Sequence, residues 1–250
     1  IEPAPAEPKA GGKIICNACP VLCNISEGRS GACDRYANLQ GVLTRLDPLV
    51  LTARTQGGLE ETDDAIRAQG GSATLFPLDL READRIDPLG QAIFQRFGRL
   101  DALVHCAGVL GKLTPAGHID PTDWADAIAV NMAATWRLIR SCDPVLRHGP
   151  AGRAVFVTDG MARKPTAYWG LLGATKAGME NLARTWAAET ETTRLRVNLF
   201  DPGPVRTRMR GAAFPGEDPA TVPGPETVAP ALAALCLPTE DRHGALVGLG

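Results

Sequence analysis

The chain has 250 residues, 44% of them hydrophobic, and a formal net charge of -2. This is enough apolar material for one large α/β domain, or for a smaller domain with an appendage, and it argues against wholesale disorder. The near-neutral charge gives no electrostatic case for binding nucleic acid or an anionic membrane, and no run of about 18 apolar residues could span a bilayer. We expect a cytoplasmic protein, because residues 1–12 lack the apolar core of a secretion signal.

The chain opens with a Pro-, Ala- and Glu-rich stretch, residues 1–12, which predicts a flexible lead-in. Residues 13–48 then hold four of the seven cysteines, namely Cys16, Cys19, Cys23 and Cys33. This spacing is typical of a metal site, and four thiolates satisfy either zinc or an iron–sulfur cluster. Two disulfides or four unligated thiols are the alternatives, of which disulfides fit a cytoplasmic chain poorly. Cys106, Cys142 and Cys236 lie in apolar stretches and are predicted to be buried thiols.

From residue 49 onward, strand and helix patterns alternate, as expected for a parallel sheet covered by helices. We predict strands at residues 49–53, 73–78, 101–105, 153–158, 195–200 and 245–247. Helices are predicted at residues 57–70, 82–97, 122–146, 166–189 and 226–235. Six strands with crossover helices predict a doubly wound sheet, whose ligands bind beyond the carboxyl ends of its strands.

Several motifs stand at those strand ends or on the helices that follow. They are Asp79, His105-Cys106-Ala107-Gly108, Asn131, Lys176 and Asp201-Pro202-Gly203-Pro204-Val205-Arg206-Thr207. In this order they make residues 49–250 resemble the short-chain dehydrogenase/reductase family. The resemblance implies a Rossmann-like fold and an NAD(P)-dependent oxidoreductase acting on a small carbonyl or alcohol. It also implies a homo-oligomer that assembles through its long helices.

The resemblance assigns roles to these residues. Cofactor-binding positions are Asp79 at the adenine, Ala107 and Gly108 near the ribose, Lys176 on the nicotinamide ribose, and Pro202, Gly203 and Thr207 over the carboxamide. Asn131 and Lys176 are implied active-site residues. Arg54 directly follows the first strand, where an arginine accepts the 2′-phosphate of NADP, so NADP is favoured over NAD. Structural alternatives are a solvated Arg54, a helix cap at Asp79, an ordinary turn at Pro202-Gly203 and a backbone hydrogen bond from Asn131.

One whole βα unit of the family pattern is absent before residue 49. No Gly-rich turn of the kind that brings backbone N–H groups to a pyrophosphate occurs there. The missing strand belongs in the middle of the sheet, so its neighbours would need a substitute, for which residues 13–16 or 42–46 are candidates. The change of pattern near residues 46–54 suggests a composite gene.

The catalytic pair of the family is also replaced. The tyrosine position holds Leu172 and the serine position holds Asp159. Leucine has no proton to exchange, and a carboxylate repels the negative charge that develops on a carbonyl oxygen. Tyr168 would lie about 12 Å from Lys176 along a helix, reaching it only from a loop, and a protonated Asp159 is the other candidate donor. Impaired activity is therefore expected.

The Cys-rich segment has a second resemblance. Cys-Asn-Ala-Cys-Pro-Val-Leu-Cys and Gly-Ala-Cys-Asp-Arg-Tyr are similar to the opening of 6-hydroxynicotinate reductase-type proteins. That resemblance implies ferredoxin-like electron transfer to a partner. Two alternatives to a dehydrogenase therefore stay open, a catalytically inactive scaffold and an iron–sulfur electron-transfer module.

Overall fold

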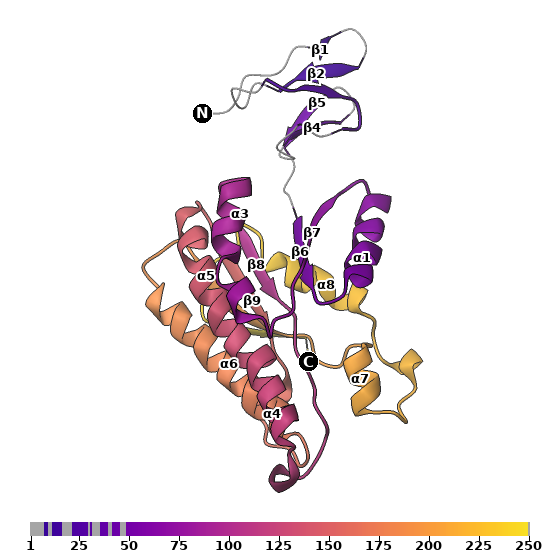
Figure 1. Ribbon diagram of the computed structural model, residues 1–250, viewed down its shortest axis with the longest axis vertical. Helices are drawn as coiled ribbons and strands as arrows, with labels where there is room; N and C mark the ends of the chain where they lie inside the picture. The colour runs from indigo at the N-terminus through magenta and orange to yellow at the C-terminus, as the bar shows by residue number, and fades with distance from the viewer. Residues whose placement is uncertain are drawn as a thin grey trace. The chain divides into compact units, whose positions relative to one another are not determined.

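The computed structural model describes residues 8–9, 12–16, 22–29, 31, 36–39, 42–45 and 49–249 (Figure 1). The chain divides into two compact units, Ile1–Asp79 and Leu80–Gly250. Cys19 and Cys33, two of the four predicted metal ligands, lie outside the described residues.

The first unit opens with short antiparallel strands. β1 (Pro8–Lys9), β2 (Lys13–Ile15) and β3 (Asn24–Ser26) form one sheet, and β4 (Tyr36–Leu39) pairs with β5 (Val42–Arg45) in another. Pro8–Lys9 is therefore paired, where we predicted a flexible lead-in. Ile14, Cys16 and Ile25 form the buried cluster of this region. The substitute-strand hypothesis is wrong for β2 and β5, because β2 pairs with β1 and β3, and β5 pairs with β4.

The rest of the first unit is a parallel strand–helix–strand. β6 (Leu49–Ala53) pairs in parallel with β7 (Ala73–Pro77), and α1 (Gln56–Ala68) connects them. α1 ends in a turn at Gly70, whose φ of +84° suits glycine and confirms the predicted stop. Asp63 of α1 accepts a hydrogen bond from the Ala73 N–H at 2.9 Å and so fixes the entry into β7.

The second unit is built on a four-stranded parallel sheet in the order β11-β10-β9-β8. Its strands are β8 (Ala102–His105), β9 (Arg153–Val157), β10 (Arg196–Asp201) and β11 (Leu246–Gly248). Its helices are α2 (Ala83–Ile86), α3 (Leu89–Phe97), α4 (Pro121–Ala127), α5 (Ala134–His148), α6 (Gly170–Glu189), α7 (Arg208–Ala213) and α8 (Pro225–Ala234). Three 3-10 turns, η1 (Ala116–His118), η3 (Gly160–Ala162) and η4 (Pro219–Thr221), and the π-helical segment η2 (Ile128–Ala133) complete it.

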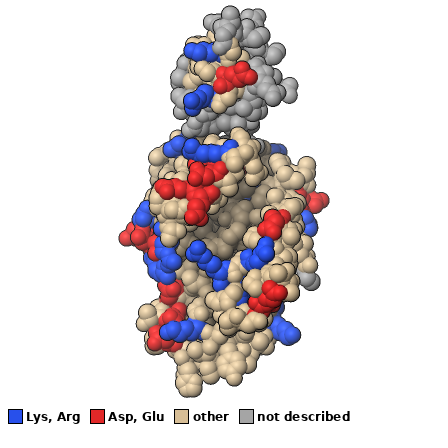
Figure 2. All heavy atoms as spheres, turned by 90° about the vertical axis from the view of Figure 1, so that its right-hand side faces the viewer, with Lys and Arg blue, Asp and Glu red and all other residues tan. Residues whose placement is uncertain are grey.

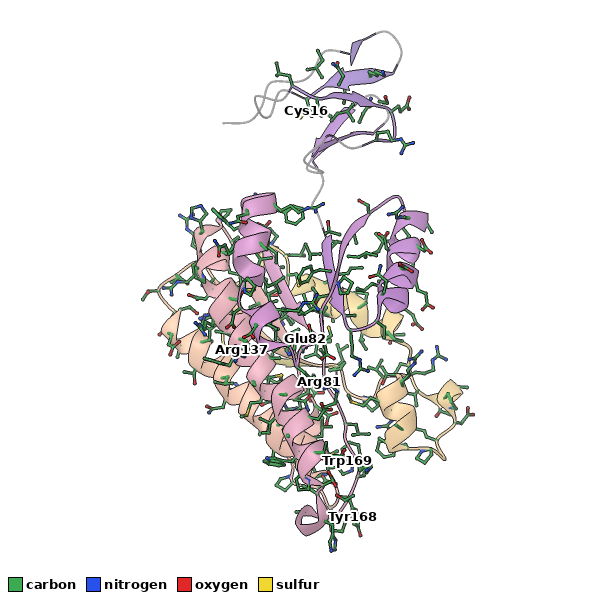
Figure 3. All side chains as sticks on the ribbon, viewed as in Figure 1. Cys16, Arg81, Glu82, Arg137, Tyr168 and Trp169 are labelled. Atoms are coloured by element: carbon green, nitrogen blue, oxygen red, sulfur yellow. The ribbon has the colours of Figure 1, made fainter. Side chains whose placement is uncertain are left out.

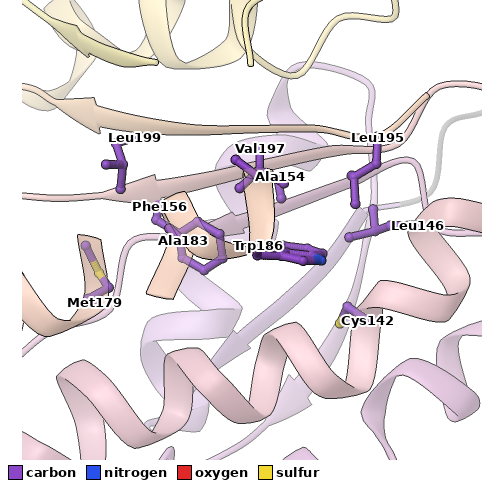
Figure 4. Packing of buried hydrophobic residues seen from close by; sticks show 11 residues of the cluster. Cys142, Leu146, Ala154, Phe156, Met179, Ala183, Trp186, Leu195, Val197 and Leu199 are labelled. Carbon is purple, nitrogen blue, oxygen red and sulfur yellow. The ribbon is translucent and has the colours of Figure 1, made fainter. Parts of the chain in front are cut away.

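Helices cover both faces of this sheet. Alternate side chains of a strand point to opposite faces, so Ala154 and Phe156 of β9 pack against α5 and α6, while Val155 packs against α8. Figure 4 shows the larger layer, in which Phe156 and Trp186 meet edge to face at 6.1 Å between ring centroids. The Trp186 indole N–H donates to Asp143 Oδ1 at 2.7 Å, which satisfies its one polar atom. This layering confirms the predicted Rossmann-like α/β architecture with helices on both faces of a parallel sheet. The six predicted strands are divided between this sheet and the β6–β7 pair.

Two predicted helices are interrupted. The helix predicted at residues 82–97 is two helices, because Pro88 cannot continue the first of them. Arg137 of α5 holds the Asp87 carboxylate at this break through a 2.9 Å hydrogen bond. The helix predicted at residues 122–146 contains η2, an insertion that hydrophobic periodicity does not reveal.

Charge on the surface is mixed in sign. On the face in Figure 2, acidic and basic side chains are interspersed without a large patch of one sign. No helix within the described ranges combines the length and apolar character that crossing a membrane requires.

Candidate active site

Lys176 lies near the carboxyl ends of β8 and β9. It projects from α6, is 5% exposed, and its Nζ donates to the carbonyl oxygen of Val157 at 2.8 Å. The turn after β8 passes so close that a Cβ on Gly108 would lie 3.4 Å from both Lys176 Nζ and Asn131 Oδ1. The structure therefore brings together three residues that the sequence predicted for one site. Gly108 leaves the space beside Lys176 open, as close approach by a ligand requires.

Asn131 is fully buried within η2 and fixes the loop after β8. Its Oδ1 accepts from the Val109 N–H at 2.8 Å, and its Nδ2 donates to the Val109 carbonyl at 3.0 Å and to Thr175 Oγ1 at 2.9 Å. The π-helical turn supplies the register change that directs this side chain away from its own helix. Asn131 thus links the loop after β8 to α6, one residue from Lys176.

Burial sets the protonation of this site. It lowers the pKa of Lys176 to about 8, and the nearby charges of Asp159, Cys106 and Glu180 act in the opposite direction. Burial, and next the charge of Lys176, lower the pKa of His105 to about 3, so this imidazole is neutral. His105 packs edge to face on Phe156, and within the described chain its Nε2 has no hydrogen-bond partner.

Lys176→Met is expected to stabilise the free protein by about 2 kcal/mol at neutral pH, because it removes a poorly solvated charge at the loss of one hydrogen bond. Between pH 8 and 10.5 the unfolded chain holds a proton that the folded lysine has lost, so the stability of the wild type rises with pH across this window. The advantage of the variant should therefore shrink there. Urea unfolding of both proteins at several pH values measures the difference, and an advantage that does not change with pH would contradict the assignment.

The two substituted positions lie beside this lysine. Leu172 is one turn before Lys176 on α6 and only 1% exposed, so its side chain fills space without offering a proton. Asp159 follows β9 and caps η3, where its Oδ1 accepts from the Met161 N–H at 2.8 Å. The Met161 carbonyl packs against α6 so tightly that a Cβ on Gly173 would lie 2.8 Å from its oxygen. This contact fixes Asp159 relative to Leu172 and Lys176.

Tyr168 does not replace the missing phenol. It lies in the turn before α6, with a φ of +72° that is rare for a non-glycine residue, and its side chain is 58% exposed. In Figure 3 it projects from the lower end of the second unit beside Trp169. The loop that this alternative required is present, but the side chain is directed to solvent.

A charged network that the sequence did not predict joins the ends of β9 and β10. Arg163 pairs with Glu180 of α6 and with Asp201, and Thr158 Oγ1 donates to Glu180 Oε1 at 2.7 Å. Glu180 lies one helical turn after Lys176 and is only 6% exposed. Its position four residues after a candidate lysine was the signal available in the sequence.

The loop after β10 is built from the predicted turn residues. Gly203 has a φ of +67°, and its N–H donates to Asp201 Oδ1 at 3.1 Å. Thr207 caps α7 by accepting from the Arg210 N–H at 3.1 Å. The Arg210 guanidinium pairs with Glu217 and lies 3.8 Å from the centre of the Phe214 ring. The Phe214 ring in turn packs on Trp169 at 5.6 Å between centroids, which ties this loop to the start of α6.

The cofactor residues predicted in the first unit lie at strand ends, as expected. Arg54 follows β6 and is exposed. Asp79 follows β7 and is half-buried, and the first residue to cap a helix after it is Glu82, so Asp79 is not that cap. The first turn of α1 has no acidic residue and no side-chain cap, and a Cβ on Gly57 would meet nothing within 4 Å.

The cysteine predictions have mixed outcomes. Cys142 is buried, Cys236 is half-buried, and Cys106 is exposed, so burial was wrongly predicted for Cys106. The Cys16 N–H donates to the Cys23 carbonyl at 2.8 Å, so these two residues face each other across β2 and β3. The described residues contain no group of three or more potential metal ligands. With Cys19 and Cys33 outside them, the zinc or iron–sulfur site stays a prediction.

The architecture and the site together define a class. A doubly wound sheet with a buried lysine, an asparagine and a close glycine turn at its carboxyl edge is the arrangement of dinucleotide-dependent oxidoreductases. A profile of short chain dehydrogenases matches residues 43–218. The chain belongs to the short-chain dehydrogenase family.

Known proteins agree with this assignment. The Escherichia coli K12 oxidoreductase YciK is 34% identical over 185 residues, which are 73% of this chain and 73% of YciK. A solved short-chain dehydrogenase of Escherichia coli CFT073, complexed with NADPH, is 32% identical with a TM-score of 0.75, over 80% of this chain and 84% of that chain. A solved short-chain dehydrogenase of Shigella flexneri 2a, complexed with NADP, is 32% identical with a TM-score of 0.76, over the same shares.

Proposed function

We propose that the protein is an NADP-dependent oxidoreductase that transfers hydride between the nicotinamide and a small organic molecule. The observation that carries this proposal is the buried Lys176 beside Gly108 and Asn131 at the carboxyl edge of the sheet. An ammonium in that position can donate to ribose hydroxyls, and the glycine admits a sugar close to the backbone. When bound, the cofactor supplies or accepts the hydride.

The residues present suit the nicotinamide end of the cofactor. Lys176 has donors beyond its bond to Val157, and the carboxamide can meet the turn at Pro202 and Gly203 and the Thr207 hydroxyl. The Leu172 side chain can neither donate nor accept a hydrogen bond. Position 172 therefore provides no proton donor beside the cofactor. Carbonyl reduction by the usual route of the family is therefore impaired.

Groups in the first unit that can bind a phosphate favour NADP over NAD. Arg54 and the uncapped first turn of α1 offer a guanidinium and free N–H groups to a 2′-phosphate. Asp79 is proposed for the adenine. NADPH and NADP in the solved relatives support the same choice. We also propose a homo-oligomer, as expected from the family resemblance.

NADPH titration followed by its fluorescence tests the proposal. The wild type should bind NADPH more tightly than NADH, and Lys176→Met should weaken binding about 10- to 100-fold, because a hydrogen bond from a charged donor is lost. Lys112→Met is the matched control, since Lys112 is an exposed lysine of the same unit that pairs with Asp123. Absence of NADPH binding by the wild type would exclude the proposed function.

A further inference from the structure

The carboxylates around the site differ in whether they form an ion pair. Glu180 and Asp201 pair with Arg163, and Glu217 pairs with Arg210. Asp159 forms no ion pair with any residue that the structure describes. One of its oxygens is held by the Met161 N–H, which leaves the other available to a ligand. Asp159 is therefore the carboxylate of this group that pairs with no guanidinium, although its charge raises the pKa of Lys176.

The reaction itself determines which substrate suits such a site. Reduction of a carbonyl places negative charge on oxygen and needs a proton, so Leu172 and Asp159 are both unfavourable for it. An iminium ion whose nitrogen carries only carbon substituents is different. Its reduction forms one C–H bond with the two electrons of a hydride from NADPH and moves the two π electrons of the C=N bond onto nitrogen. The products are a neutral tertiary amine and NADP⁺, and no proton is transferred.

We propose that Asp159 is a specificity-determining residue that binds a cationic iminium substrate for reduction by NADPH. This inference rests on the proposed function and assigns its substrate class. In it, Asp159 replaces a neutral donor with a counter-ion, and the absence of a proton donor at Leu172 has no consequence for the reaction. One substrate class thus accounts for both departures from the family pattern.

The surroundings of Asp159 fit an organic cation. The pKa of Arg210 is raised first by its hydrogen bonds to Glu217 and also by the charge of Asp159. Arg210 is bound by both oxygens of Glu217, at 2.7 and 2.6 Å, and forms no ion pair with Asp159.

The charge on the substrate also predicts which kinetic parameter depends on Asp159. Hydride transfer moves the positive charge from the iminium to the nicotinamide, so Asp159 stabilises the bound substrate and the transition state to similar extents. An interaction of this kind lowers KM and leaves kcat little changed. A merely structural role would instead alter folding or kcat.

The test is binding of N-methylisoquinolinium to the NADP⁺ complex by calorimetry, where no hydride is available and the readout is affinity alone. Asp159→Asn keeps an acceptor for the Met161 N–H and should bind this cation about tenfold more weakly than the wild type. Neutral isoquinoline, at mildly alkaline pH, should bind both proteins equally. Glu226→Gln, which removes an exposed carboxylate of α8, should match the wild type.

Kinetics extend the test. With N-methyl-dihydroisoquinolinium and NADPH, Asp159→Asn should raise KM about tenfold with little change in kcat. Equal cation affinity in the wild type and Asp159→Asn, alongside normal NADPH binding, would overturn this assignment alone. Failure of NADPH to bind would overturn the proposed function and this assignment together.

Discussion

The double substitution Leu172→Tyr with Asp159→Ser is expected to raise kcat/KM for ketone reduction by about 10²- to 10⁴-fold, the usual contribution of a positioned proton donor. Residues 172 and 176 are one helical turn apart, so a phenol at 172 would lie beside the Lys176 ammonium, which lowers the pKa of a neighbouring phenol. Serine at 159 removes the carboxylate and restores a neutral donor. Tetralone reduction by NADPH, followed by absorbance, measures the gain.

Matched variants separate the phenol from its bulk. In the variant Leu172→Phe with Asp159→Ser, the phenylalanine fills almost the same volume as the tyrosine but has no hydroxyl. This variant should show no gain in ketone reduction. Either single change should give only a fraction of the effect, because the donor and the oxyanion partner act on the same atom. Because Leu172 is buried, thermal unfolding must first show that each variant is folded. If the double variant binds NADPH and still reduces no ketone, the catalytic defect lies elsewhere in the site.

The same double variant connects this prediction with the substrate proposal. It should lose preference for the iminium ion as it gains activity on the ketone, because the charge that selects the cation is removed. A variant that gains ketone activity and keeps its full affinity for the cation would separate Asp159 from substrate selection. The exchange of one preference for the other is therefore a sharper measurement than either activity alone.

Local patterns predicted most of the architecture. The strand Leu49–Ala53 begins and ends as predicted, and the other five strands of the parallel sheets differ by at most one residue at either end. Apolar runs and turn residues are local signals, and burial on both faces of β9 and β10 adds a strong constraint. The pairing of β2 and β5 was predicted wrongly, because both join antiparallel neighbours close in sequence, β2 with β1 and β3 and β5 with β4, and not a parallel sheet.

The sequence predicted which residues belong to the site, but it did not predict the contacts that they make. The family resemblance placed Lys176, Asn131 and Gly108 in one site, and the structure brings these three residues close together. It did not reveal that Asn131 bonds to both polar backbone groups of Val109, since η2 has no signature in hydrophobic periodicity. Arg163 was missed for a related reason, because its two carboxylate partners come from different elements.

The sequence also does not reveal which glycines lie at close contacts between helices. Substitution of one of them, Gly90, has the largest expected effect on stability. Gly90 is the second residue of α3, and a Cβ there would lie 1.9 Å from the carbonyl oxygen of Ser141 in α5. The two helices are also joined by a 2.8 Å hydrogen bond from the Gly90 N–H to Ser141 Oγ. Gly90→Ala is therefore expected to destabilise the protein by about 3 kcal/mol, because α3 must move away from α5.

Helix propensity alone predicts the opposite sign for Gly90→Ala, since alanine is favoured over glycine by about 1 kcal/mol within a helix. Gly211→Ala in α7 is the matched control, because a Cβ at Gly211 would meet nothing within 4 Å. That variant should be neutral or stabilised by up to about 1 kcal/mol. Urea unfolding of both variants decides between the two effects. If Gly90→Ala were as stable as Gly211→Ala, α3 and α5 would not pack as closely as the structure shows, and the second unit would tolerate a wider spacing between them.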